Sequence, residues 1–490
     1  MPKRQAVQFI GQTAQDRAVS VNNQLTLNLQ VEKKSQGAKA QYVLETNAGI
    51  LDQGTAGDGP CRTRQIPKWI SPVDGVERAY AVFGSKLIAI DSNLNTTEIG
   101  TLAGASGQAN IARGRNQLFI TDTTAGYTYD GTTFAAIADL DYPTNFVPPG
   151  RTTHAVYADG FFITNDANTD NFYISDPEDA TAWNALDFEA ASVSPDAADA
   201  VISSGAILYV VGDETLQPFY NSGNADFPYA LYIQAVSNFG ILAPQSIAES
   251  DAGVFYLGTT PEGGAFVVRV VGTNAEIISE DEQETTLANL TTPSEAYGFI
   301  YQISGKAFYV LQLDPSDTTN QTLCYNIKSG TWETRAIQDG SAWRPSGAGV
   351  IGRANIVGSR LAARFGTLNL EVYQDSGQQM IRRRVTEIFH NNNQLIDWWE
   401  LMIDVDPGIG ISTGNEEDVD PMLRLRYSDT GGKDWSSVLE EPIGKIGEFQ
   451  RRAVYRNLGS SRNRIFEIEY SANTPFTIIA AYAYITINED

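Results

Sequence analysis

Few residues of this 490-residue chain have the types and spacing that metal binding or catalysis needs. In the segment DANTDN, side-chain oxygens alternate at Asp166, Asn168 and Asp170, as they do in calcium-binding loops. The segment lacks the glycine of such loops, and Pro177 stands where the closing glutamate belongs. It is a weak calcium candidate, and the alternative is a polar hairpin tip between two apolar runs.

Catalytic constellations are harder to find. The chain has two histidines, His154 and His390, and neither has a neighbouring acid and nucleophile pattern. Its two cysteines, Cys61 and Cys324, lie far apart and outside any CxxC context, which predicts two buried thiols. There is no HExxH, P-loop or strand-borne GxGxxG motif. We therefore expect no enzyme and no cofactor.

One turn does have a known pattern. YSDTGGKDWS at residues 427–436 resembles an Asp-box, a turn found in sialidases and in many other β proteins, with Thr430 in place of the second aspartate. In those proteins the box is a folding element and not the active site. It predicts a β-hairpin turn, not glycoside cleavage.

Charge is the strongest compositional signal. The net charge is −25, which argues against a protein that grips nucleic-acid phosphates or anionic membranes through a basic face. Residues 71–375 hold 13 Lys and Arg against 36 Asp and Glu, while residues 1–70 have a small basic excess. Residues 152–268 contain no Lys or Arg and 16 acidic residues. Such a one-sign field suggests a functional surface, and a generally acidic surface is the alternative.

The elements that carry these residues are predicted to be strands. Short apolar runs recur at roughly 43–54 residues, each followed by a turn and a second strand, which is the period of four-stranded propeller blades. The leading runs start at Leu87, Leu118, Phe161, Ile207, Val254, Ala307 and Leu361. We predict an all-β fold with a β-propeller of six or seven blades, and a pair of β-sandwiches is the competing architecture. Helical pattern appears only near 177–186 and 279–290.

Three segments follow from charge and pattern. Residues 1–70 are expected to form an extended N-terminal arm with assembly contacts, 71–375 the acidic propeller, and 376–490 an antiparallel, sandwich-like β domain. The start of the chain has no apolar run of signal-peptide length, and no stretch has the ~18 apolar residues of a membrane helix. These features predict a soluble chain made in a cytoplasm.

The last segment offers candidate interface residues. The tandem Trp398 and Trp399 is either an interface anchor or core packing of the C-terminal domain. The same domain has a basic cluster that is expected to pair with an acidic neighbouring subunit, and nucleic-acid contact is the alternative. The cluster consists of Arg451, Arg452, Arg456, Arg462 and Arg464.

The C-terminal block resembles the end of the packaged-DNA stabilisation proteins of short-tailed (podovirus) bacteriophages, also called tail hub or tail nozzle proteins. In that family a YSDDGGKTW-like turn is followed by a glycine-rich link, an RVxWxRLG segment and a final strand pair. The matching stretches here are 427–435, 444–447, 452–459, 464–471 and 474–482.

The resemblance extends to the rest of the chain. Residues 200–249 are similar to the family's central stretch. The N-terminal segment is similar to its opening arm, VNxQxxxNLYxE, at Asn23, Asn28, Leu29, Glu32, Gly37, Leu44, Thr46 and Gly49. Asn47 and Ala48 replace the usual proline.

The resemblance implies a structural virion protein. Such proteins form a homo-hexameric tube below the portal and its adaptor (head-to-tail connector) ring, close the DNA exit, carry a tail needle or plug, and anchor tail fibres or tailspikes. The protein would be assembled in the bacterial host cytoplasm and reside in the virion tail. The charge agrees independently, because an acidic lumen lets double-stranded DNA pass without sticking. We therefore expect the acidic residues of 152–268 to contribute to the channel face.

A carbohydrate-active or carbohydrate-binding, sialidase-like propeller is the alternative function. Sialidases gather an arginine triad and a Tyr/Glu pair at the propeller axis. The arginine-free segment 152–268 removes two or three blades from that task, which counts against the enzyme.

Overall fold

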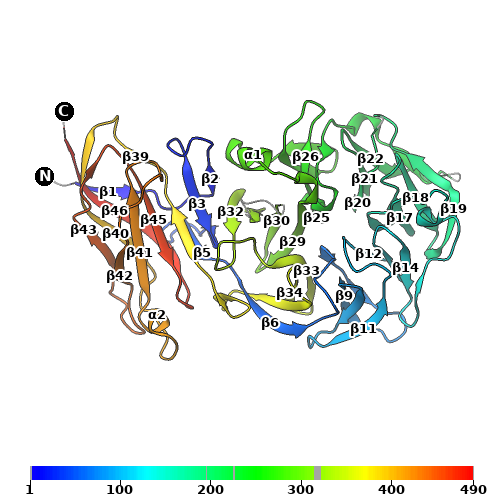
Figure 1. Cartoon of the computed structure of the whole chain (residues 1–490), viewed down its shortest axis with the longest axis horizontal. Coiled ribbons are helices and arrows are strands. Elements are labelled where there is room, and N and C mark those ends of the chain that lie inside the picture. The colour runs from blue at the N-terminus through cyan, green and yellow to red at the C-terminus, as the bar shows by residue number, and fades with distance from the viewer. Residues whose placement is uncertain (1–2, 195, 225–226, 314–321, 489–490) are drawn as a thin grey trace.

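A ring of seven antiparallel sheets and a two-sheet β domain make up the chain (Figure 1). The computed structural model describes residues 3–194, 196–224, 227–313 and 322–488. The seven sheets confirm a propeller, and the blade number is the higher of the two expected values. In the described part of the chain no helix has the length or apolar character of a membrane span.

Each of the first four blades is one four-stranded meander, in which the chain runs from the axis outwards. Blade 1 comprises β8 (Lys68–Ile70), β9 (Glu77–Phe83), β10 (Lys86–Ile90) and β11 (Thr96–Thr101). Blade 2 comprises β12 (Asn110–Arg113), β13 (Leu118–Thr121), β14 (Gly126–Tyr129) and β15 (Phe134–Ala136). Blade 3 comprises β16 (Ala155–Ala158), β17 (Phe161–Asn165), β18 (Asn171–Asp176) and β19 (Asp179–Ala190). Blade 4 comprises β20 (Ala200–Ser204), β21 (Ile207–Val211), β22 (Leu216–Asn221) and β23 (Tyr229–Leu231).

The last three blades have additions to this plan. Blade 5 comprises β24 (Gly240–Ile241), β25 (Ala248–Ser250), β26 (Gly253–Thr259), β27 (Phe266–Val271) and β28 (Asn274–Ile277), and helix α1 (Asp281–Ala288) follows it. Blade 6 comprises β29 (Tyr297–Ile303), β30 (Lys306–Gln312), β31 (Thr322–Asn326) and β32 (Thr331–Arg335). Blade 7 comprises β33 (Pro345–Ile351), β34 (Ala354–Ser359) and β35 (Arg364–Asn369), with β6 (Gly49–Thr55) as its fourth strand. Strand β7 (Gln65–Ile66) lies beside β33, and the short strands β36 (Gln374–Asp375) and β37 (Gln378–Gln379) lie beyond β6. Short 3-10 turns lie at Pro143–Asn145, Ile233–Ala235, Pro244–Ser246 and Pro293–Glu295.

The ring is closed by a strand from the start of the chain. Strand β6 pairs antiparallel with β35, so blade 7 takes its outer strand from residues that precede blade 1. Between neighbouring blades, apolar side chains of facing sheets are buried together, as Ile163 and Phe172 are with Leu208 and Phe219. The apolar runs that start at Leu118, Phe161, Ile207, Val254 and Ala307 lie next to the innermost strand of blades 2–6, whereas the run at 87–90 lies in β10, the third strand of blade 1. The run at 361–365 is not in an equivalent strand either, because the second strand of blade 7 is β34.

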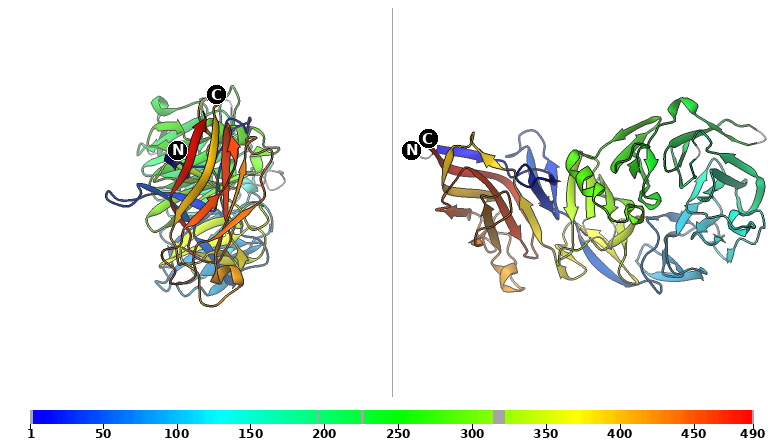
Figure 2. Two further views of the ribbon diagram at one scale, coloured as in Figure 1. Left: turned by 90° about the vertical axis from the view of Figure 1, so that its left-hand side faces the viewer. Right: turned by 45° about the horizontal axis from the view of Figure 1, so that its top comes forward.

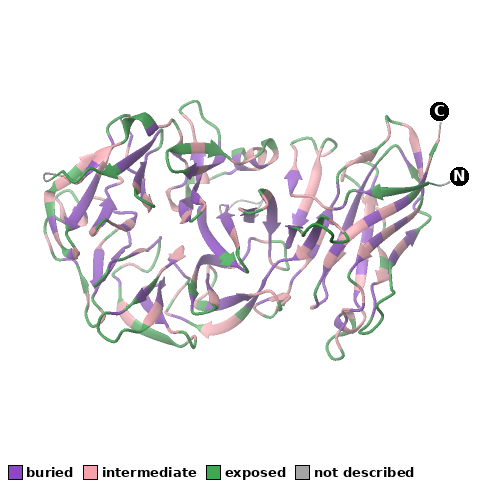
Figure 3. Cartoon of the chain, turned by 180° about the vertical axis from the view of Figure 1, so that it is seen from behind, coloured by how far each residue is buried: buried purple, intermediate pink, exposed green. Residues whose placement is uncertain are grey.

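The C-terminal domain is a sandwich. One sheet contains β4 (Leu29–Lys33), β5 (Tyr42–Thr46), β46 (Thr477–Asn488), β40 (Leu395–Val405) and β43 (Ala453–Arg456), with β1 (Lys3–Val7) and β44 (Ser460–Ser461) at its margins. The other contains β3 (Asn23–Leu27), β38 (Arg382–Val385), β45 (Asn463–Tyr470), β41 (Met422–Ser428) and β42 (Leu439–Pro442), with β2 (Ala14–Gln15) and β39 (Phe389–His390). A short helix, α2 (Glu416–Val419), lies in the loop before β41. The apolar core lies between the sheets (Figure 3).

Residues 1–70, expected as one extended arm, are divided between the two domains. Strands β1, β3, β4 and β5 belong to the sandwich, whereas β6, β7 and β8 belong to the propeller. Strand β3 also joins the domains, because it pairs parallel with β32 of blade 6 and antiparallel with β38 of the sandwich. Blade 6 therefore continues into the sandwich as one eleven-stranded sheet, and the sandwich stands at the side of the propeller (Figure 2).

Candidate functional site

The junction between propeller and sandwich is built around Asn28. Its side chain is 1% exposed and makes hydrogen bonds to both domains. The amide nitrogen Nδ2 donates to the carbonyl oxygens of Ala336, at 2.9 Å, and Ile381, at 2.8 Å, and Oδ1 accepts from the backbone N–H of Ala336. The backbone of Asn28 is left-handed, with φ of 54°, a conformation that asparagine tolerates better than most residues.

Arg384 holds the N-terminal segment against the sandwich. Its guanidinium is fully buried and donates to the carbonyl oxygens of Phe9 and Gln12, to Thr26 Oγ1, and to Gln24 Oε1 at 2.6 Å. Burial lowers the pKa of Arg384 to about 9, so the group stays charged at neutral pH. The Arg384 guanidinium thus binds four groups of the segment between residues 9 and 26.

Two acidic residues complete the junction. Glu32 of β4 forms an ion pair with Lys306 of blade 6. Glu333 of β32 is buried, accepts from Asn47 Nδ2 at 3.0 Å, and has a pKa raised by burial to about 8. Several positions of the family's N-terminal pattern, including Asn28 and Glu32, therefore lie where the two domains meet. We infer that the pattern specifies the joint.

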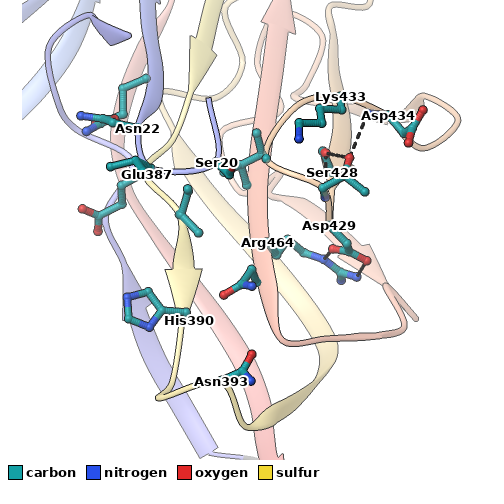
Figure 4. Close-up of a pocket in the computed structure, with 17 residues that line it drawn as sticks. Ser20, Asn22, Glu387, His390, Asn393, Ser428, Asp429, Lys433, Asp434 and Arg464 are labelled. Carbon is teal, nitrogen blue, oxygen red and sulfur yellow. Dashed lines mark hydrogen bonds and ion pairs between the residues drawn. The ribbon is translucent and has the colours of Figure 1, made fainter. Parts of the chain in front are cut away.

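The Asp-box turn lies at a cavity of about 840 Å³ on the sandwich, beside the N-terminal segment (Figure 4). Arg464, which is 1% exposed, makes two hydrogen bonds to Asp429, from Nε at 2.6 Å and from Nη2 at 2.8 Å. Within the turn, Thr430 Oγ1 accepts from the backbone N–H of Asp434. The threonine thus accepts a backbone hydrogen bond at the position where the box normally has its second aspartate. The turn acts as a fold element.

The two tandem tryptophans have different surroundings. Trp398 is 4% exposed, and its ring centroid lies 5.2 Å from that of Phe466 in the sandwich core. Trp399 is 50% exposed and donates to Thr486 Oγ1. The register of β40 against β46 shifts between Trp398 and Glu400, so the tandem lies at a β-bulge. Trp398 is therefore a core residue of the sandwich. Trp399 is exposed, and an interface role for it stays a prediction.

The arginines of the basic cluster differ in burial. Arg451, Arg452 and Arg456 are exposed, and Arg456 forms an ion pair with Glu400 at 3.1 Å. Arg464, which follows in sequence, is instead buried with Asp429. The three exposed arginines leave a basic margin on a chain that is otherwise acidic.

The calcium candidate forms the tip between β17 and β18. Asp166 is 4% exposed, and its Oδ1 accepts from the backbone N–H groups of Arg151 and Asn168. Across the described ranges, no group of three or more His, Cys, Asp or Glu side chains is placed to hold a metal ion. The carboxylate of Asp166 satisfies backbone donors in a turn.

The histidines and cysteines have structural surroundings. His154 is buried at the propeller axis, where Nε2 lies 3.1 Å from the carbonyl oxygen of Pro244, and burial lowers its pKa to about 4. Cys61 and Cys324 are buried free thiols whose pKa values are raised by burial. His390 lines the cavity of the Asp-box.

The acidic segment occupies blades 3, 4 and most of blade 5. Blades 3 and 4 lie at the end of the propeller that is remote from the sandwich (Figure 1). Among its described acidic residues only Asp166 and Asp196 are buried, and Asp226 lies outside the described residues. Most carboxylates of residues 152–268 are therefore exposed or half-exposed, and this segment has no lysine or arginine to balance them.

Sequence reasoning missed the buried arginines. Arg382 and Arg384 alternate on β38 and both are fully buried, and Arg335 at the end of β32 is buried as well. The sequence feature that marks two of these arginines is the run RRRV at residues 382–385. That pattern looks like a solvated strand, because arginines are rarely buried without a carboxylate.

The chain is a propeller that continues into a β-sandwich, and comparison with known families gives its membership. The model described as "Bacteriophage P22 Gp10, beta-propeller" matches residues 9–373, and the one described as "Bacteriophage P22 Gp10, beta-sandwich" matches residues 381–486. The chain belongs to the bacteriophage P22 Gp10 family. It is a phage structural protein that acts in the virion tail and in DNA stabilisation, and not an enzyme.

The solved structures that match this chain are distant from it. The N-terminal domain of Nup159 has a TM-score of 0.41 and 9% identity, and covers 70% of this chain and 98% of its own. A catalytically inactive virginiamycin B lyase from Staphylococcus aureus, solved with quinupristin, has a TM-score of 0.44 and 10% identity, and covers 65% and 98%. A search of curated proteins gives no match. The functional argument therefore rests on the family and on the chain's own surfaces.

Proposed function

We propose that the protein forms the hexameric tail nozzle, or hub, of a short-tailed phage, below the portal and the adaptor ring. In this position it retains the packaged DNA and serves as the exit conduit during ejection. The observation that carries the proposal is the one-sign charge of residues 152–268 on the blades remote from the sandwich. A surface of this kind is suited to face DNA that must not adhere.

The physical reason is electrostatic. Duplex DNA has one phosphate charge per ~1.7 Å of its axis, so any lysine or arginine on the wall of a tube would hold it. A wall of carboxylates repels the phosphates and keeps the duplex centred. Exposed carboxylates such as Asp213, Asp251 and Glu262 would contribute to this wall.

The sandwich would supply contacts in the assembly. Trp399 and the half-exposed ring of Tyr484 lie on one sheet face, and an aromatic pair suits an interface core. Arg451 and Arg452 would pair with the acidic surface of a neighbouring subunit. The rigid joint at Asn28 would keep the two domains at a fixed angle, which a closed ring requires.

The remaining partners follow from the proposed place in the virion. The adaptor ring would contact one end of the tube, a tail needle or plug the other, and tail fibres or tailspikes the outside. DNA would pass without specific binding. The subunits would assemble in the host cytoplasm.

Charge reversal tests the conduit. Phage particles assembled with Asp213→Lys, Asp251→Lys and Glu262→Lys together should eject DNA more slowly, because the wall would bind phosphates. A matched triple variant, Glu371→Lys, Asp434→Lys and Glu448→Lys, changes three exposed carboxylates outside the acidic segment and should eject at the parental rate. Equal ejection rates for both sets would contradict the acidic lumen.

A further inference from the structure

One end of the propeller channel concentrates positive charge in a chain of net charge −25. A cavity of about 640 Å³ opens there, where the innermost strands of several blades begin. Arg62, Arg64 and Arg360 line it, and Glu295 at its rim is the acidic residue among its lining. Arg64 also lines a second cavity of about 780 Å³ along the inner strands, so it stands between the two.

The guanidinium groups of Arg64 and Arg360 are fixed in orientation. Arg64 donates from Nε to Gln108 Oε1 at 3.2 Å and from Nη1 to the carbonyl oxygen of Ser346 at 3.1 Å. Arg360 donates from Nε and Nη2 to two backbone carbonyl oxygens of the loop before β33, at 3.0 and 2.9 Å. Each group keeps a terminal nitrogen, Nη2 of Arg64 and Nη1 of Arg360, that has no acceptor in the described part of the chain.

Arg64 and Arg360 differ from Arg62 in having no counter-ion among the described residues. Arg62 faces Asp122 at 3.5 Å and donates to four backbone carbonyl oxygens. For Arg64 and Arg360, no carboxylate of the described residues lies within the 4.0 Å of an ion pair. Burial lowers the pKa of Arg64, as it does for a cation that is removed from water without an anion beside it.

A buried hydroxyl without a partner lies at the same place. Tyr297 is 6% exposed, and its hydroxyl has no hydrogen-bond partner among the described residues. The guanidinium carbon of Arg64 lies 3.7 Å from the centre of the Tyr297 ring. Burial raises the pKa of Tyr297, so its hydroxyl remains a protonated donor. A buried donor without an acceptor costs stability unless a ligand satisfies it.

We propose that this cavity binds a small oxyanion, a phosphate or a carboxylate group, between Arg64, Arg360 and the hydroxyl of Tyr297. Guanidinium and hydroxyl donors with no internal acceptor match the oxygens of such a group, and charge-assisted hydrogen bonds would neutralise the two arginines. The cavity lies inside one propeller, so duplex DNA does not fit it. The site is therefore separate from the conduit surface.

Calorimetric titration of the full-length protein tests the site, with inorganic phosphate and with a tetra-aspartate peptide as probes. We expect at least one probe to bind with a dissociation constant of about 1 mM or lower, and Arg64→Gln and Arg360→Gln to weaken it at least tenfold. Arg353→Gln, on an exposed turn of the same blade, should bind as the parent does. Phosphate binding would identify a free anion as the ligand, and binding of the peptide alone would identify a polypeptide carboxylate.

Tyr297→Phe keeps the proposal testable if an arginine variant does not fold. It removes only the unpartnered hydroxyl, so the fold should persist and binding should weaken several-fold. Absence of binding for both probes at 10 mM, or binding that all three cavity variants leave unchanged, would overturn the proposal.

Discussion

Replacing Asn28 with alanine should separate the propeller from the sandwich. The side chain makes three buried hydrogen bonds, two as a donor to Ala336 and Ile381 and one as an acceptor from Ala336. Each buried hydrogen bond of this kind contributes about 1 kcal/mol, so their loss costs about 3 kcal/mol. Alanine in a left-handed conformation costs about 1 kcal/mol more. Asn28→Ala should therefore lower the free energy of unfolding by about 4 kcal/mol.

A matched control isolates the hydrogen bonds. Asn392 is also left-handed, with φ of 46°, but it is exposed and its side chain has no hydrogen bond in the structure as described. Asn392→Ala should cost about 1 kcal/mol from the backbone alone. Urea unfolding followed by tryptophan fluorescence gives both values, and calorimetry shows whether the domains melt together. Asn28→Ala should show two separate transitions. A stability within about 0.5 kcal/mol of the Asn392→Ala control would refute the joint.

Further predictions concern titration and packing. Glu333 has a pKa near 8 in the fold and about 4.5 when unfolded, so the stability of the wild type should fall as pH rises from 4.5 to 8. In urea titrations at pH 7, the free energy of unfolding of Glu333→Gln should therefore exceed that of the wild type by about 3 kcal/mol. His154 has a pKa near 4 in the fold and about 6.5 when unfolded, so its contribution is present above pH 6.5 and about 3 kcal/mol is lost as pH falls to 4. A His154→Gln variant whose melting temperature keeps the wild-type acid dependence would exclude this assignment. Trp398→Ala should destabilise the fold by about 3–5 kcal/mol, whereas Trp399→Ala should leave the melting temperature nearly unchanged and weaken ring assembly in sedimentation runs.

The propeller could be predicted from the sequence because its apolar strand runs recur periodically. Strand pairs recur with a spacing that survives variation in single residues, so five of the seven leading runs fall on equivalent strands, next to the innermost strand of blades 2–6. The last run failed because blade 7 is completed by β6, and a strand borrowed from 300 residues away leaves no local period. The second segment with helical pattern does contain α1, at Asp281–Ala288. The first, at 177–186, instead leads into the edge strand β19, whose pairing with β18 overrides the helix propensity of its alanines.

The contact between the propeller and the sandwich could not be predicted from local sequence patterns. The parallel contact of β3 with β32 rests on a single register pair, Leu27 with Thr334, and such a long-range pairing has no signature in either strand. The burial of Arg382 and Arg384 depends on carbonyl oxygens from distant segments, so their charges gave no hint of it. For Trp398 and Trp399 the sequence left core packing and an interface role open. Adjacent residues on a strand normally face opposite sides of the sheet, and the sequence does not tell which side faces the core.

The central claim is that this chain closes into a hexameric ring in the tail. Native mass spectrometry of the purified protein, alone and after mixing with complexes of portal and adaptor, tests it most directly. The account predicts a particle of six 53.3 kDa subunits, either alone or on the complex. A chain that stays monomeric and ignores both rings would contradict it.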